Sequence, residues 1–92
     1  MLNQDPRDQM DFVQRMFDAN KRQLLIKSLE NGEFVPDFPG YIIARDFLAA
    51  QRGNQGLRNM YYSELSEDQW KDPEIKRTAE LIVKKYNEAY PQ

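Results

Sequence analysis

Carboxylates are the side chains of this sequence whose type and spacing could do chemistry. They form two groups near expected helix starts: Asp5, Asp8 and Asp11, and Glu64, Glu67 and Asp68. Paired carboxylates can perform acid–base catalysis or hold Mg²⁺. Acidic residues also stabilise helix N-termini, where both groups are expected to lie. We therefore interpret both as helix-capping groups, and a carboxylate–magnesium enzyme is the least favoured function.

The 92-residue chain contains no histidine and no cysteine. Without cysteine there can be no disulfide, iron–sulfur ligation or thiol catalysis. Without histidine the chain lacks the commonest metal ligand and the commonest general base near neutral pH, so a serine nucleophile would have no histidine to serve it. We predict a protein that is not an enzyme, with no catalytic residues, no metal and no cofactor.

Basic residues offer a second kind of chemistry, contact with nucleic acid. The candidate residues lie in two predicted helices: Arg58, Lys76, Arg77, Lys84 and Lys85. The chain has 13 Lys and Arg against 15 Asp and Glu, a net charge of −2, and neither sign dominates any third of it. Attraction to nucleic acid depends on clustered positive charge, so we do not favour this interpretation.

A helix-turn-helix could still be drawn through residues 41–65, with residues 53–56 as the turn. Its second helix, residues 57–65, contains Arg58, Asn59 and Ser63, which can read base edges. That helix is short and has only one basic residue. A small nucleic-acid-associated regulator that uses the last helix or residues 57–65 is therefore the alternative function.

Aromatic residues and methionine are the third candidate set, for contact with a partner protein. They flank a proline-rich segment and a short predicted helix: Phe34, Phe38, Tyr41, Met60, Tyr61, Tyr62 and Trp70. Tyr86 and Tyr90 close the chain. Aromatic residues and methionine are enriched at the buried centres of interfaces. A small core of short helices also needs large side chains, and the residue pattern leaves both interpretations open.

Helix start and stop signals indicate where these residues are placed. Asp5-Pro6 and Asp72-Pro73 pair a capping residue with a proline suited to the first helical position. Gly32 and the residue range 53–56 are typical helix ends. A first helix is expected from about residue 6, and it either runs unbroken to residue 30 or breaks at residues 18–20. In the second case Asn20 would cap a helix over residues 21–30.

Three further helical segments are expected, at about residues 40–52, 57–65 and 73–88. The last has Ile75, Ala79, Ile82 and Tyr86 at helical spacing. Ser66 and Gln69 have capping-box spacing, which predicts a single turn carrying Trp70. Residues 33–40 contain two prolines and three apolar residues, so they predict a connector that packs on the core or on a partner.

These patterns predict an all-α fold, a single small domain over residues 1–92, with four or five helices and a proline-rich apolar connector at residues 33–40. The first and last helices are expected to pack on the central one. No apolar run is long enough to span a bilayer, and the start does not resemble a signal peptide, so an intracellular, cytoplasmic protein is expected.

The function that these features favour is a non-catalytic protein–protein interaction module. Such a module would serve as an accessory subunit, adaptor or inhibitor, and the size suits a phage-type accessory protein. Its partner would be another protein or a second copy of the chain. Nucleic acid is a less favoured partner, and no membrane contact is expected.

Overall fold

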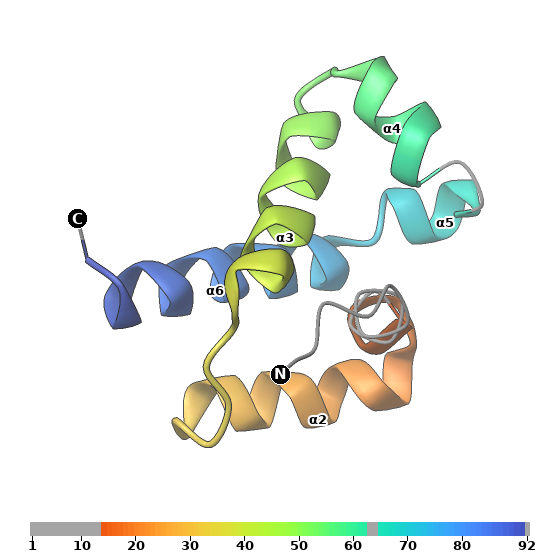
Figure 1. Cartoon of the computed structure of the whole chain (residues 1–92). Helices are drawn as coiled ribbons and strands as arrows, with labels where there is room; N and C mark the ends of the chain where they lie inside the picture. Colours follow the sequence, from red (N-terminus) through yellow and green to blue (C-terminus); the bar gives the residue numbers. More distant parts are fainter. Residues whose placement is uncertain (1–13, 63–64, 92) are drawn as a thin grey trace.

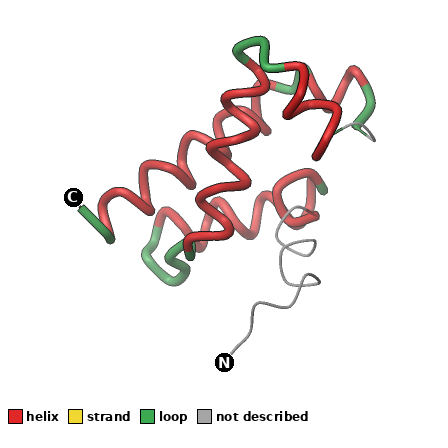
Figure 2. The backbone as a smooth tube through the Cα atoms, turned by 45° about the horizontal axis from the view of Figure 1, so that its top comes forward, coloured by secondary structure: helices red, strands yellow, loops and turns green. Residues whose placement is uncertain are grey.

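The computed structural model describes residues 14–62 and 65–91; most of these residues are helical, and there is no strand among them. Within the described residues, five helices are defined in order: α2 (Ala19–Glu30), α3 (Phe38–Gln51), α4 (Gln55–Tyr61), α5 (Glu67–Trp70) and α6 (Pro73–Ala89). Residues 14–17 are also helical, whereas the predicted start at Asp5-Pro6 lies outside the described residues. The all-α prediction is confirmed (Figures 1 and 2). None of the helices in the described ranges is long and apolar enough to cross a membrane.

The chain bends at Asp18, between the helical residues 14–17 and α2. The Asp18 carboxylate accepts hydrogen bonds from the backbone N–H groups of Asn20 and Lys21, each at 3.0 Å. These are N–H groups that the first turn of a helix leaves without a partner. Of the two alternatives, the break at residues 18–20 is confirmed and the unbroken helix is wrong. The expected cap at Asn20 is also wrong. Asp18 is the cap because its extended backbone lets its carboxylate reach both groups.

Residues 31–37 connect α2 to α3, and the connector ends three residues earlier than predicted. Gly32 adopts φ +80°, which confirms the expected helix stop. The Asp37 carboxylate accepts a hydrogen bond of 2.9 Å from the Gly40 N–H, so α3 begins at Phe38 and includes Pro39. Proline fits there because N–H groups of the first turn have no partner within the helix. The connector packs on the core, with Pro36 fully buried.

The centre of the core is the crossing of α3 and α6 (Figure 1). The buried side chains of these two helices are Ala44, Phe47, Ala50, Ile75, Ala79 and Ile82. The predicted apolar stripe of the last helix is confirmed, and α3 packs against both α6 and α4, as expected of a central helix. α2 packs mainly on α6 and not on α3, so the expectation that it packs on the central helix is wrong.

Four rings fill the space between α3, α4 and α5, and we call them the inner aromatic cluster: Phe17, Phe47, Tyr62 and Trp70. The Phe47 ring lies 5.5 Å from those of Phe17 and Tyr62 and 5.3 Å from that of Trp70, centroid to centroid. The predicted capping box at Ser66 and Gln69 is present and starts α5. α4 starts and ends earlier than the predicted residues 57–65.

Arg22 is a buried cation, only 4% exposed, that joins three segments. Its Nη1 donates to the backbone carbonyls of Met16 and Phe17, at 3.2 Å each. Its Nε and Nη2 each lie 2.8 Å from Oε1 of Glu74 in the first turn of α6. A buried charge is tolerated when it is paired and its donors are satisfied, and both conditions are met here. Arg22 therefore holds the end of the first helical segment against the start of α6.

Candidate functional site

Four aromatic rings meet on the outside of the α3–α6 crossing, and we call them the outer aromatic cluster: Phe38, Tyr41, Tyr86 and Tyr90. The Tyr41 and Tyr86 rings are stacked, with centroids 4.4 Å apart and an interplanar angle of 20°. The Phe38 centroid lies 6.1 Å from that of Tyr41 and 6.3 Å from that of Tyr86. The Tyr90 centroid lies 4.9 Å from that of Tyr86, so the four rings are continuous.

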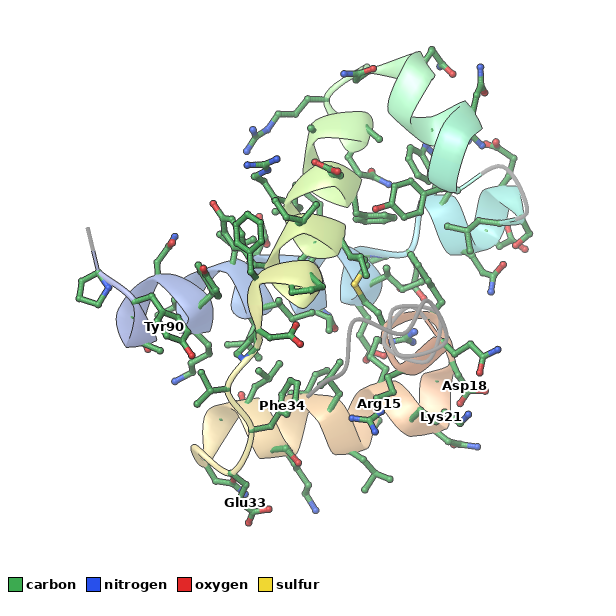
Figure 3. All side chains as sticks on the ribbon, in the orientation of Figure 1. Arg15, Asp18, Lys21, Glu33, Phe34 and Tyr90 are labelled. Carbon is green, nitrogen blue, oxygen red and sulfur yellow. The ribbon has the colours of Figure 1, made fainter. Side chains whose placement is uncertain are left out.

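The helix geometry explains why these rings meet. Phe38 and Tyr41 are three residues apart in the first turn of α3, and Tyr86 and Tyr90 are four apart at the end of α6. Side chains at these spacings lie on the same helix face. The crossing of α3 over α6 then brings the start of one helix to the last turns of the other (Figure 1). Figure 3 labels Tyr90 at that end of α6.

The outer aromatic cluster is partly open to solvent. Phe38 is 58% exposed and Tyr90 is 54% exposed, whereas Tyr41 and Tyr86 are half-buried. Val35, in the connector just before Phe38, is 49% exposed. The Arg45 guanidinium lies 5.7 Å from the centroid of the Tyr41 ring and adds a cation–π contact. A continuous group of exposed apolar side chains is characteristic of an interaction site.

The structure divides the predicted partner-binding residues. Phe38 and Tyr41 belong to the outer aromatic cluster. Phe34 is half-buried against the core and lies between α2 and the start of α3 (Figure 3). Met60 and Tyr61 belong to α4, and their side chains lie outside the described part of the structure.

Two of the predicted partner-binding residues need correction, because Tyr62 is 3% exposed and Trp70 is 9% exposed. Both belong to the inner aromatic cluster and are not available to a partner. The Tyr62 hydroxyl can be buried because it donates a 2.7 Å hydrogen bond to the Ile43 carbonyl. α4 and α5 are short, and these large rings supply the apolar surface with which they pack on α3.

No pattern in the sequence joins Tyr86 and Tyr90 to Phe38 and Tyr41. The spacing of three or four residues at a helix end does predict that the two rings of each pair lie on one helix face. No sequence pattern predicts that the two pairs of rings contact each other, because that contact depends on how α3 crosses α6. Local spacing can identify a helix face, but it does not identify the opposing face.

The residues proposed for nucleic-acid contact are only partly free. Lys76, Arg77 and Lys84 are exposed on α6, and Lys85 is half-buried with its Nζ 3.5 Å from Oε1 of Glu88. Arg58 is used within the fold. Its guanidinium lies 4.5 Å from the centroid of the Trp70 ring and donates a hydrogen bond to the Glu67 carboxylate. The prediction of Arg58 as a base-reading residue is therefore corrected, because its planar cation covers a core ring.

Two members of the second carboxylate group lie at a helix start as expected, but the cap is Ser66 and neither carboxylate. Glu67 and Asp68 lie in the first turn of α5. The hydrogen bond and positive charge of Arg58 lower the pKa of Glu67 below its ordinary value of 4.5. Within residues 14–62 and 65–91, no group of three or more carboxylates is placed to hold a metal ion. Asp5, Asp8, Asp11 and Glu64 lie outside the described residues.

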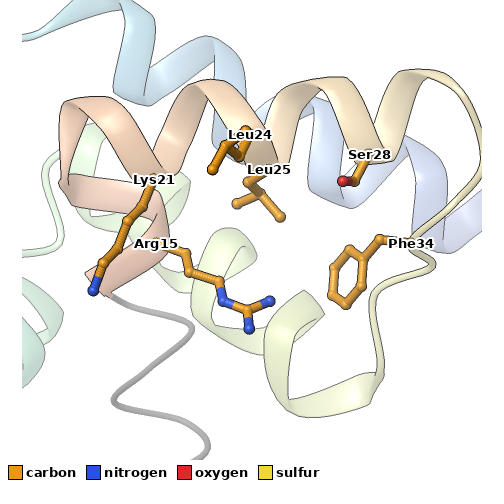
Figure 4. A pocket seen from close by; sticks show the side chains of 6 residues that line it. All are labelled: Arg15, Lys21, Leu24, Leu25, Ser28 and Phe34. Atoms are coloured by element: carbon orange, nitrogen blue, oxygen red, sulfur yellow. The ribbon is translucent and has the colours of Figure 1, made fainter.

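A groove of about 390 Å³ lies along α2. The residues that line it come from α2 and its neighbours (Figure 4): Arg15, Lys21, Leu24, Leu25, Ser28 and Phe34. Leu24 is 67% exposed, so the groove opens to solvent. Its lining combines two cations with an apolar wall and the Ser28 hydroxyl.

Comparison with known proteins gives no match to a family model, to a curated protein sequence or to a solved structure.

Proposed function

We propose that this chain is a non-catalytic protein–protein interaction module and that the outer aromatic cluster is its binding surface. The observation that carries the proposal is the continuous set of four rings, of which Phe38 and Tyr90 are more than half exposed. Large rings that become buried on binding contribute much of the affinity of a protein interface. The role would be that of an accessory subunit, adaptor or inhibitor.

The composition also supports a non-catalytic role. The chain has no histidine and no cysteine, and Glu67 and Asp68 lie in the first turn of α5, which Ser66 caps. Nucleic-acid binding is less well supported, because Arg58 is engaged by Trp70 and Glu67. On α6 the exposed basic residues are interspersed with Glu80 and Glu88, which weakens any attraction to phosphate.

Affinity capture with the tagged chain tests the proposal. The intact chain should capture a partner from a lysate of its source cells, and the double variant Phe38→Ser/Tyr90→Ser should reduce that capture at least about tenfold. Leu24→Ser is the matched control, since Leu24 is more exposed than either ring and lies on α2. Equal capture by the intact chain and the double variant would contradict the proposed surface.

Light scattering provides the second arm of the same test. If the partner is a second copy, the intact chain should have twice the mass of the double variant at equal concentration. A monomeric intact chain that captures nothing dependent on Phe38 and Tyr90 would overturn the proposed function.

A further inference from the structure

The groove along α2, which we call the α2 groove, is a second candidate binding site apart from the outer aromatic cluster. Its volume of about 390 Å³ is within the roughly 300–1,000 Å³ of small-molecule sites. Lys21, Leu25 and Ser28 line it from one face of α2, at spacings of four and three residues. Arg15, from the helical segment before α2, extends toward Phe34 of the connector (Figure 4). Three segments of the chain therefore build the groove.

Packing holds the apolar part of the α2 groove in place. The Phe34 N–H donates a 3.1 Å hydrogen bond to the Ser28 carbonyl in the last turn of α2, which folds the connector back on the helix. Leu25 is 4% exposed and belongs to the core, whereas Leu24 is an exposed residue of the rim. The apolar wall is thus formed before anything binds, so binding does not have to order it.

The charged residues of the lining have one sign. Arg15 and Lys21 are exposed cations, and no carboxylate is among the described residues that line the groove. The carboxylates of Asp18 and Glu33 accept hydrogen bonds from amide groups of their own turns. Glu30 lies on the opposite face of α2 from Lys21, because nine helical residues make two and a half turns. The α2 groove is therefore complementary to an anion.

The hydrogen-bonding groups of the lining restrict the class of anion. Apart from the two cations, Ser28 is the only polar residue of the described lining. Arg and Lys donate hydrogen bonds and accept none, so the Ser28 hydroxyl is the single side-chain acceptor. A peptide would bury backbone N–H groups here, and a sugar would bury hydroxyls, with too few acceptors to pair them. A carboxylate needs donors only, and an alkyl chain needs no hydrogen bond.

We propose that the α2 groove binds the anion of a free fatty acid. The carboxylate pairs with Arg15 and Lys21, and the alkyl chain lies against Leu25 and Phe34. This inference goes beyond the proposed function and does not rest on it, because the two sites share no residue.

Isothermal titration calorimetry with the intact chain tests the assignment. The probes are dodecanoate below its aggregation concentration, acetate, dodecyltrimethylammonium and a ten-residue peptide of alternating leucine and glutamate. Acetate has the charge without the alkyl chain, and dodecyltrimethylammonium has the same chain with the opposite charge. We expect dodecanoate to bind in the micromolar range and each of the other three probes to bind at least about tenfold more weakly, because both the charge and the apolar contact are required.

Substitution of the two cations tests the charge contribution. Arg15→Gln and Lys21→Gln should each weaken dodecanoate binding about threefold, and the double variant about tenfold, as expected for partly exposed ion pairs. Lys27→Gln is the matched control, since Lys27 is an exposed cation of α2 that does not line the groove, and it should leave the affinity unchanged. Circular dichroism checks that the variants keep the fold.

Amide chemical shifts locate the bound anion. Dodecanoate should shift the amides of residues 15–28 and 34 and leave those of residues 86–90 unchanged. Shifts confined to residues 38–41 and 86–90 would place the chain on the outer aromatic cluster and overturn the assignment.

The assignment would also be overturned if dodecanoate did not bind, if the double variant bound it as tightly as the intact chain, or if dodecyltrimethylammonium bound equally well. Peptide binding that depends on Arg15 and Lys21, without dodecanoate binding, would replace the fatty acid with a segment of a partner protein. None of these results changes the capture expected from the outer aromatic cluster, so the two proposals fail separately.

Discussion

The two aromatic clusters lie at opposite ends of α3 and differ in what covers them. The inner aromatic cluster is built around Phe47, which is fully buried, and is closed by α4 and α5. The outer aromatic cluster begins at Phe38, which is 58% exposed although it belongs to the same helix. Ring content is therefore a poor guide to burial in this fold. The presence of a covering element decides whether a ring stabilises the domain or stays available to a partner.

The polar neighbours of the clusters differ in the same way. In the inner cluster, Arg58 lies 4.5 Å from the Trp70 centroid and its carboxylate partner Glu67 is held beside it. In the outer cluster, Arg45 lies 5.7 Å from the Tyr41 centroid and its guanidinium is largely exposed. Arg58 therefore helps to cover the Trp70 ring, whereas Arg45 leaves the Tyr41 ring partly accessible to solvent.

The largest expected contrast is between alanine substitutions of Phe47 and Phe38. Phe47→Ala removes a fully buried ring and should lower the free energy of unfolding by about 3–5 kcal/mol. Phe38→Ala removes a ring that is mostly solvated and should change it by less than about 0.5 kcal/mol. Urea unfolding followed by circular dichroism measures both.

A small domain has roughly 5–15 kcal/mol of stability, and Phe47→Ala removes a large share of it. Phe47→Leu, with an expected loss of about 1–2 kcal/mol, keeps the comparison measurable. Similar losses at positions 47 and 38 would show that the two clusters are equally part of the core.

The next contrast compares the two arginines. Arg58→Met should lower the free energy of unfolding by about 1 kcal/mol, because the guanidinium is partly desolvated over Trp70. Arg45→Met should cost no more than a few tenths of a kcal/mol, as expected for an exposed cation paired on the surface. Thermal unfolding of the two variants side by side provides the measurement. If Arg45→Met lowered the free energy of unfolding more than Arg58→Met, the proposed difference between the two arginines would be contradicted.

The smallest expected effect is the titration of Glu67. Because Arg58 lowers the folded-state pKa of Glu67 below 4.5, the ionised carboxylate favours the folded state. This contribution is fully present above the unfolded-state pKa and is lost as the pH falls through the lower, folded-state pKa. NMR titration of the side-chain carboxyl should give a midpoint below 4.5 in the intact protein. In Arg58→Met the midpoint should rise toward 4.5, and an unchanged midpoint would contradict the assigned cause.

Local interactions account for the parts of the fold that sequence patterns predicted. The Ser66 capping box and the Asp72 cap act within three residues, so their side chains and N–H groups are visible in the sequence. Asp18 was harder to recognise, because a bend there competes with a continuous helix. The bend is supported by Arg22, whose partner Glu74 is 52 residues away.

The candidate site was predicted in part for the same reason. Phe38 and Tyr41 are neighbours on one helix, and an aromatic surface near them was expected. The stacking of Tyr41 on Tyr86 arises from the α3–α6 crossing, and the burial of Tyr62 arises from its packing on Phe47. Both result from tertiary packing, which cannot be predicted from the spacing of residues along the chain.

The buried position of Arg22 has a consequence for how the molecule opens. Its guanidinium is bonded at once to the carbonyls of residues 16 and 17 and to the first turn of α6. If either segment frayed alone, a buried cation would lose part of its compensation, which is energetically costly. The beginning and the last third of the described chain should therefore exchange their amide hydrogens as one cooperative unit, even though more than fifty residues separate them.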